Sequence, residues 1–112
     1  MTSFKRGDIV LVEFAYAQGG GSKKRPALVI SVEAYHRSRH EVILAAVTGN
    51  VERNLLGDTL VTEWETAGLL APSVVTGIVR TIKREMILKT IGRLTPMDYS
   101  VVEENLKKVL GF

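Results

Sequence analysis

Short apolar runs separated by turn-forming residues are the feature that most constrains the fold of this 112-residue chain. The runs are rich in Val, Ile, Leu and aromatic residues, and they are too short for typical helices. They cover residues 8–14, 27–32, 41–47, 59–62, 73–80 and 87–94. Several short strands at this spacing, joined by turns that often contain glycine, favour a small β-barrel or sandwich.

The last segment changes from strand to helix periodicity. Thr95 is a good N-cap, Pro96 suits the first helical turn, and Gly111 is a plausible C-cap. The apolar residues that recur at helical spacing between these ends are Tyr99, Val102, Leu106 and Val109. The sequence therefore predicts a mainly β fold, a small barrel crossed by one C-terminal α-helix. Its length predicts one domain over residues 1–112.

Composition and charge narrow the function classes. The chain has no cysteine, which excludes disulfides and thiolate metal sites. Its N-terminus lacks a signal-peptide pattern and no apolar run is long enough to span a bilayer, so the expected compartment is the cytoplasm. Residues 54–79 contain no Lys or Arg, whereas residues 80–93 contain five. This separation suggests a basic face and a polyanionic partner, although ordinary exposed strand residues are the simpler explanation of charge alone.

A short basic segment runs directly into the second apolar run. It reads Lys23, Lys24, Arg25 and Pro26, preceded by three glycines. An arginine at the start of a buried strand is held more firmly than one in a flexible terminal segment. Its planar guanidinium presents hydrogen-bond donors in a geometry that matches phosphate oxygens. Arg25 is therefore a candidate phosphate-binding residue. A solvated, lysine-rich turn is the alternative, and the local residues do not decide between the two.

Thr48 closes the third apolar run. In an antiparallel pair the end of one strand lies beside the start of its neighbour, so Arg25 and Thr48 could share one rim of the barrel. A guanidinium and a hydroxyl placed there would suit a pentacovalent phosphorane, whose oxygens gain charge. The commoner role for a threonine before glycine is a hydrogen bond to its own backbone.

Other chemistries have little support in the sequence. His36 and His40 are four residues apart, a spacing that brings two metal ligands together only on a helix. Their stretch is very polar and lies between two predicted strands, so we interpret it as a solvated loop and expect no metal. No phosphate-cradling loop motif and no Ser–His–Asp order occurs, and no cofactor is expected.

Four segments carry a family resemblance: Arg-Gly-Asp-Ile-Val-Leu-Val at 6–12, Arg-Pro-Ala-Leu-Val-Ile-Ser at 25–31, Ala-Val-Thr at 46–48 and Ile-Gly-Arg-Leu at 91–94. In order and spacing they resemble the MazF/PemK toxins of bacterial type II toxin–antitoxin systems. The resemblance implies a CcdB/PemK-type SH3-like barrel, usually a homodimer. It also implies a metal-independent endoribonuclease (an mRNA interferase) that cuts single-stranded RNA at short sequences. In such enzymes the ribose 2′-hydroxyl attacks the adjacent phosphate, leaving 2′,3′-cyclic phosphate and 5′-hydroxyl ends.

The same resemblance assigns the site. It places the catalytic arginine on Arg25, for protonation or charge stabilisation at the scissile phosphate, and the catalytic threonine on Thr48, for stabilisation of the transition state. Because a guanidinium hardly gives up its proton, electrostatic stabilisation is the expected role of Arg25. Loops at about 15–24 and 49–57 would form the RNA groove. Their expected substrate contacts are Lys23, Lys24, Asn50, Arg53 and Tyr16.

Two departures from the family pattern concern the first loop, which lacks an acidic residue, and Lys83, where aspartate is common in the family. No acidic general base is therefore assigned. The implied partner is a cognate antitoxin whose flexible tail occupies the RNA groove. Either the alternating strands or the final helix could supply a self-complementary dimer surface. The alternative function is a non-catalytic binding module of the same fold, inhibiting gyrase or binding RNA without cutting it.

Overall fold

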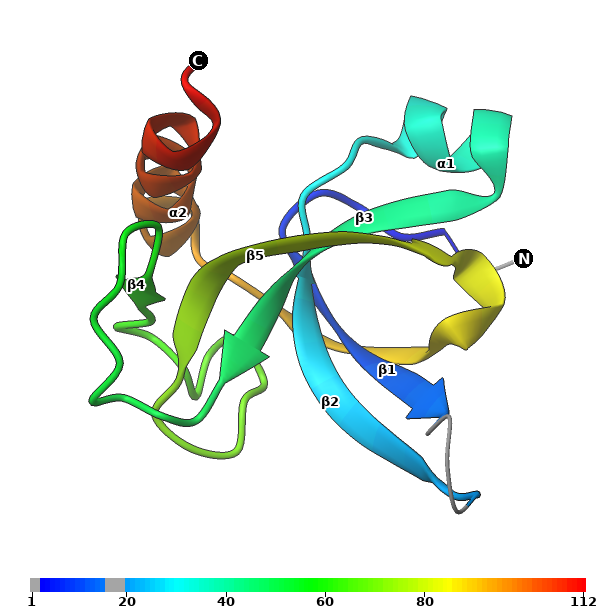
Figure 1. Cartoon of the computed structure of the whole chain (residues 1–112), viewed down its shortest axis with the longest axis horizontal. Helices are drawn as coiled ribbons and strands as arrows, with labels where there is room; N and C mark the ends of the chain where they lie inside the picture. The colour runs from blue at the N-terminus through cyan, green and yellow to red at the C-terminus, as the bar shows by residue number, and fades with distance from the viewer. Residues whose placement is uncertain (1–2, 16–19) are drawn as a thin grey trace.

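The computed structural model describes residues 3–15 and 20–112. Within these residues six strands form one antiparallel sheet in the order β4-β5-β3-β2-β1-β6 (Figure 1). The strands are β1 (Asp8–Ala15), β2 (Ser22–Val29), β3 (Glu41–Thr48), β4 (Thr59–Leu60), β5 (Val74–Lys83) and β6 (Ile87–Arg93). The helices are α1 (Glu33–Arg39), α2 (Pro96–Leu110) and the short 3-10 helix η1 (Arg84–Met86).

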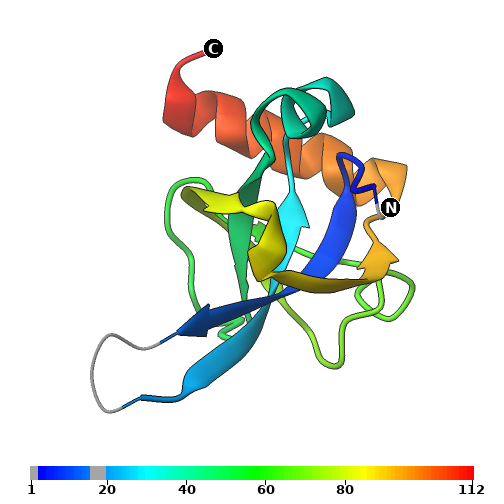
Figure 2. The same ribbon diagram turned by 90° about the vertical axis from the view of Figure 1, so that its right-hand side faces the viewer.

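The sheet coils on itself rather than lying flat. β5 arches over β3 (Figure 1). α2 packs on the far side of the molecule from the last residues of β1 and the first residues of β2 (Figures 1 and 2). Both views place those two strand ends well away from α2. The predicted mainly β architecture with a C-terminal helix is confirmed.

Apolar side chains on the two faces of the sheet form separate cores. Along β1, Ile9 belongs to the first cluster, whereas Val10 and Val12 belong to the second, as strand alternation requires. The first cluster, on the α2 side, also contains Leu28, Ala45, Val75, Val102 and Leu106. The second, inside the curl, also contains Phe4, Ala27, Val29, Val42, Leu44, Ile82 and Ile87. Burial on both faces explains why the strands appear in the sequence as nearly continuous apolar runs.

The C-terminal helix has the predicted ends. The Thr95 hydroxyl accepts a hydrogen bond from the Asp98 backbone N–H at 3.2 Å, and Gly111 adopts φ +79° at the C-cap. The buried Asp98 carboxylate then accepts from both backbone and hydroxyl of Thr62 and from the backbone of Glu63. These bonds join the first turn of α2 to the segment after β4.

The second strand begins earlier than the sequence predicted. β2 starts at Ser22, so Lys23, Lys24 and Arg25 are strand residues and not a loop. They pair with β1, while pairing with β3 begins only at Ala27. At Pro26, β2 therefore has a neighbour on one side only, a place where a strand tolerates proline.

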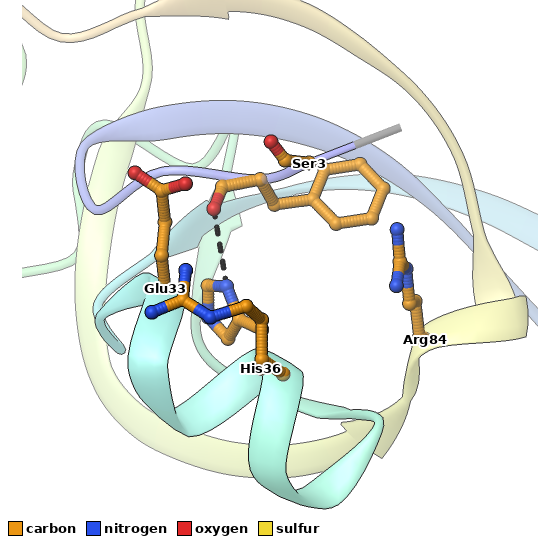
Figure 3. Close-up of a pocket in the computed structure, with 6 residues that line it drawn as sticks. Ser3, Glu33, His36 and Arg84 are labelled. Atoms are coloured by element: carbon orange, nitrogen blue, oxygen red, sulfur yellow. Dashed lines mark hydrogen bonds between the residues drawn. The ribbon is translucent and has the colours of Figure 1, made fainter. Parts of the chain in front are cut away.

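The stretch around His36 is a helix, so the loop prediction was wrong. His36 is buried in α1, and its Nδ1 lies 3.1 Å from the carbonyl oxygen of Phe4 (Figure 3). Because a carbonyl only accepts, Nδ1 carries the proton, and Nε2 accepts from the Ser31 hydroxyl at 2.6 Å. His40 ends the helix in the left-handed conformation at φ 54° and is exposed. The two histidines have separate structural roles.

Across the described residues, no helix combines the length and the apolar character needed to cross a membrane.

Candidate active site

The register of β2 and β3 relates the two predicted catalytic residues. The ladder pairs Val29 with Leu44 and Ala27 with Ala46. Continued by two residues past its last pair, the same register sets Arg25 opposite Thr48. Alternation from the buried residues of each strand also places both on the face of the second core cluster. Arg25 and Thr48 therefore lie where the strands open beyond that cluster.

Thr48 already serves the turn that follows β3. Its hydroxyl oxygen accepts a hydrogen bond from the Asn50 backbone N–H at 3.2 Å. The Asn50 side-chain oxygen in turn accepts from the Glu52 backbone N–H at 3.2 Å. The backbone-bonding role expected of a threonine before glycine is thus present. A hydroxyl that accepts one bond keeps its proton to donate, so the turn orients Thr48 without using up its donor.

Arg80, which no sequence pattern indicates as a site residue, lies at the same opening. The guanidinium carbon of Arg80 lies 4.8 Å from the centroid of the Phe14 ring. Arg80 pairs with Leu44 across β3 and β5, so it belongs to the same face as the second cluster. Phe14 alternates with Val12 on β1 and packs against that cluster. Only the coiling of the sheet brings the ends of β1 and β5 together, and no local sequence pattern indicates this contact.

The two predicted lysine contacts lie on opposite faces of β2. Alternation places Lys23 with Arg25, and its partner across β1 is Phe14. Lys24 points to the other face, opposite Glu13, whose carboxylate accepts from the Ser22 hydroxyl at 2.7 Å. Lys23, Arg25 and Arg80 are hence cations on the same face of the sheet as Phe14, and we call these three residues the basic face.

The remaining predicted contacts belong to the segment after Thr48 or fall outside the described residues. The Nε of Arg53 donates to both carboxylate oxygens of Asp58, at 3.2 and 3.0 Å. The side chain of Asp58 is only 5% exposed, so this ion pair stabilises the loop before β4. Tyr16 lies outside the residues that the structure describes.

The basic residues of segment 80–93 do not gather on one surface. Arg80 lies over Phe14, whereas Arg84 lies 5.8 Å from the Phe4 ring. Arg93 forms an ion pair of 2.8 Å with Asp8. Of these three arginines, Arg80 is the one on the basic face.

A hollow of about 220 Å³ lies beside α1, lined by residues that include Ser3, Glu33, His36 and Arg84 (Figure 3). It lies near the start of β3, while Thr48 ends that strand. Seven residue steps of about 3.3 Å separate the two ends, roughly 23 Å. The hollow is therefore distinct from the Arg25 and Thr48 opening. In residues 3–15 and 20–112, no group of three or more His, Asp or Glu side chains could hold a metal ion.

Solved structures share this fold over nearly the whole chain. A MazE–MazF complex from Deinococcus radiodurans has 22% identity and a TM-score of 0.82, with 99% of each chain covered. An endoribonuclease in complex with its cognate antitoxin, from Mycobacterial species, has 17% identity and a TM-score of 0.77. The match covers 98% of this chain and 97% of that one. At these identities the likeness establishes the fold.

Sequence comparison establishes the family. None of the curated proteins matches the chain. The family model of PemK-like, MazF-like toxins of type II toxin–antitoxin systems matches residues 5–110, nearly the full length. The chain therefore belongs to the PemK-like, MazF-like toxin family of type II toxin–antitoxin systems.

Proposed function

We propose that the chain is the toxin of a type II toxin–antitoxin system and a metal-independent endoribonuclease. Its substrate is single-stranded RNA, cut at short sequences in the cytoplasm, where mRNA occurs. The observation that supports the proposal is the β2–β3 register: its last pair is Ala27 with Ala46, and Arg25 and Thr48 follow two residues further along each strand, on the same face by alternation. Family membership supports the activity, and the solved relative that is an endoribonuclease has the same fold. We propose that the single domain over residues 1–112 carries the whole reaction.

The chemistry needs charge stabilisation more than it needs a metal. The ribose 2′-oxygen forms a bond to phosphorus while the bond from phosphorus to the 5′-oxygen breaks. The 2′-hydroxyl loses its proton and the departing 5′-oxygen gains one. In the phosphorane, Arg25 neutralises the non-bridging oxygens and the Thr48 hydroxyl donates to one of them. Lys23 and Arg80 hold the neighbouring phosphates, and Phe14 orients Arg80 through its ring face.

Cleavage with a chelator present tests the proposal. The purified protein should cut single-stranded RNA and leave 5′-hydroxyl and 2′,3′-cyclic phosphate ends. Arg25→Ala should lower kcat by about 10²–10³-fold, the usual effect of removing one donor to a developing oxyanion. Arg39→Ala is the matched control, because Arg39 is exposed on α1 and bonded to Glu41. Undiminished cleavage by Arg25→Ala would refute the role of Arg25.

The alternative function has a distinct outcome in the same experiment. A non-catalytic binding module would cut no member of a diverse RNA pool. It would instead bind RNA or gyrase tightly, and Arg25→Ala would weaken that RNA binding without any product appearing. Binding without cleavage would therefore replace the endoribonuclease proposal.

We also propose that a cognate antitoxin binds the basic face. The solved relatives from Deinococcus radiodurans and Mycobacterial species are complexes with an antitoxin, and they support a similar assembly here. Lys23, Arg25 and Arg80 would attract acidic residues of a flexible segment, which orders on binding. Added antitoxin should then compete with RNA, and charge reversal at Lys23 should weaken both interactions.

A homodimer is proposed through the groove beside α2. This groove has a volume of about 360 Å³, and its apolar lining is Ile30, Ile43, Val79, Leu106, Leu110 and Phe112. Arg6, Glu103 and Lys107 supply charges of both signs at its edge, which suits a self-complementary contact. Leu110 is 50% exposed and Phe112 90% exposed in the single chain.

The oligomeric state in solution tests this groove. Leu110→Glu should convert a dimer to a monomer in sedimentation or light scattering. Leu70→Glu is the matched control, since Leu70 is 99% exposed and does not line the groove. A monomeric wild-type protein, or a dimer that survives Leu110→Glu, contradicts this interface.

A further inference from the structure

The pairing of β3 with β5 changes register two residues before Thr48. The pairs on either side of the change are Ala45–Val79 and Val47–Val75. One residue of β3, Ala46, therefore lies opposite three residues of β5, 76–78. This is an extended β-bulge. Bulges bend a strand, interrupt its ladder and re-aim side chains nearby, so the position of Thr48 depends on how this one is held.

A buried hydroxyl joins the two sides of the bulge. Thr76 is 2% exposed, and its hydroxyl donates to the Ala46 carbonyl oxygen at 2.9 Å. The Thr76 hydroxyl oxygen in turn accepts a hydrogen bond from the Ile78 backbone N–H at 3.1 Å. Thr76 thus links the bulged segment of β5 to the single residue of β3 that faces it. Each of these backbone groups would lose a partner if the hydroxyl were removed.

The outer side of the bulge is packed against neighbouring elements. A methyl group built on Gly77 would lie 3.4 Å from the Val109 side chain and 3.5 Å from the Gly57 Cα atom. The bulge is therefore confined between α2 and the loop before β4. Packing restrains it from outside, while the Thr76 hydroxyl is the polar link on the β3 side.

We propose that Thr76 is a positioning residue for RNA cleavage, an inference that rests on the proposed endoribonuclease function. Its hydroxyl fixes the bulge, and the bulge fixes Thr48 relative to Arg25. Without the hydroxyl, Ala46 loses a bond to β5 and the Thr48 end of β3 shifts. RNA binding depends on the basic face and stays intact, because Lys23 and Arg25 lie on β2 and Arg80 is held over the Phe14 ring, beyond the bulge.

Steady-state kinetics of two variants test the proposal. Thr76→Val keeps the shape of the side chain but removes the hydroxyl. It should lower kcat by about ten- to a hundredfold, the cost of misplacing a catalytic group by about 1 Å, and leave KM nearly unchanged. Thr76→Ser restores the hydroxyl and should restore kcat. An unchanged kcat in Thr76→Val, or a Thr76→Ser variant as slow as Thr76→Val, overturns the proposal.

A matched control separates positioning from a general loss of stability. Thr59 is 4% exposed on the neighbouring β4, and its hydroxyl accepts from the Asn105 side chain at 2.7 Å. Thr59→Val therefore removes a buried hydrogen bond without touching the bulge, and kcat should not change. An equal loss of kcat in Thr59→Val would show that Thr76 acts only through stability.

Amide hydrogen exchange distinguishes failure of this inference from failure of the proposed function. In Thr76→Val the Ile78 and Asn50 amides should exchange faster than in wild type, whether or not RNA is cut. If the wild-type protein cleaves no RNA, the endoribonuclease proposal fails, and faster exchange still supports the role of the Thr76 hydroxyl in holding the bulge. Exchange that is unchanged at both amides overturns that role.

Discussion

Removal of the Asp98 carboxylate should destabilise the whole fold, because this one side chain joins α2 to the segment after β4. Asp98 is 3% exposed and accepts three hydrogen bonds from two residues. The distances are 3.3 Å to the Thr62 backbone nitrogen, 2.7 Å to the Thr62 hydroxyl and 3.0 Å to the Glu63 backbone nitrogen. Asp98→Ala deletes all three and also removes a negative charge from the first turn of the helix.

The magnitude follows from the exposure of the donors. A hydrogen bond to a charged group contributes about 1.5–3 kcal/mol. Thr62 and Glu63 are exposed residues, so their N–H groups regain water and the low value applies. The Thr62 hydroxyl can rotate toward solvent, so loss of its bond adds little to the cost in free energy of unfolding. Two backbone bonds at about 1.5 kcal/mol each therefore predict a loss of about 3 kcal/mol in the free energy of unfolding for Asp98→Ala.

Asp98→Asn should have an intermediate effect, since its amide oxygen still accepts from Thr62 while its amide nitrogen cannot accept from Glu63. Urea unfolding followed by the fluorescence of Trp64, the single tryptophan, measures both variants. Trp64 packs against the first core cluster in the anchored segment, so its signal reports on this contact. At about 4 °C per kcal/mol, Asp98→Ala should also lower Tm by about 12 °C.

The control is Glu104→Ala, which removes an exposed carboxylate from the same helix and should change stability by less than about 0.5 kcal/mol. The reasoning is refuted if Asp98→Ala loses less than about 1 kcal/mol, or if Asp98→Asn is as unstable as Asp98→Ala.

Three further predictions concern other parts of the fold. A Cβ on Gly92 would lie 1.9 Å from the Ala67 carbonyl oxygen, so Gly92→Ala should cost about 3 kcal/mol or prevent folding in thermal melts. Gly49→Ala, at a position where the Cβ meets no described atom within 4 Å, is its control. Burial raises the pKa of Tyr99, so its neutral form is favoured in the folded state. The raised pKa therefore contributes to the free energy of unfolding. This contribution is complete below about pH 10 and is lost as pH rises above it, and Tyr99→Phe should reduce the fall of Tm at alkaline pH. His36→Ala leaves the Phe4 carbonyl unpaired and should cost about 2 kcal/mol by urea titration, while RNA cleavage at the other end of the barrel continues.

The short apolar runs predicted β1, β3, β5 and β6 within a few residues, because each of these strands contains apolar residues that belong to or pack against one of the two core clusters. The start of β2 was missed for the opposite reason. Lys23 and Lys24 are exposed beyond the core, and only pairing with β1 makes them strand residues. A polar sequence carries no periodic apolar signal, so this pairing is a tertiary property.

Helix α1 was missed because it is short and mostly polar. It has seven residues, and His36 is its buried one. A helix of that length is not stable alone in water, so its bonds to Phe4 and Ser31 and its packing on the sheet must hold it. By contrast, α2 was predicted end to end because capping by Thr95 and Gly111 is local chemistry.

The sequence likewise predicted part of the candidate site, and the rest depended on the tertiary structure. That Arg25 and Thr48 could meet required only antiparallel pairing of two adjacent strands, which the sequence suggests. Which lysine accompanies them required the register, because a shift of one residue turns a side chain to the other face. Lys24 was expected at the site and lies on the opposite face from Arg25.

The sequence by itself determined a mainly β chain with a capped C-terminal helix, its family, and the candidate pair Arg25 and Thr48 on two successive strands. These follow from local propensity, periodicity and motif, which act over a few residues. The tertiary structure alone decided that Arg80 stacks on Phe14 and that a bulge held by Thr76 precedes Thr48. Both depend on the coiling of the sheet, which brings together strands far apart in the chain and is encoded in no single segment.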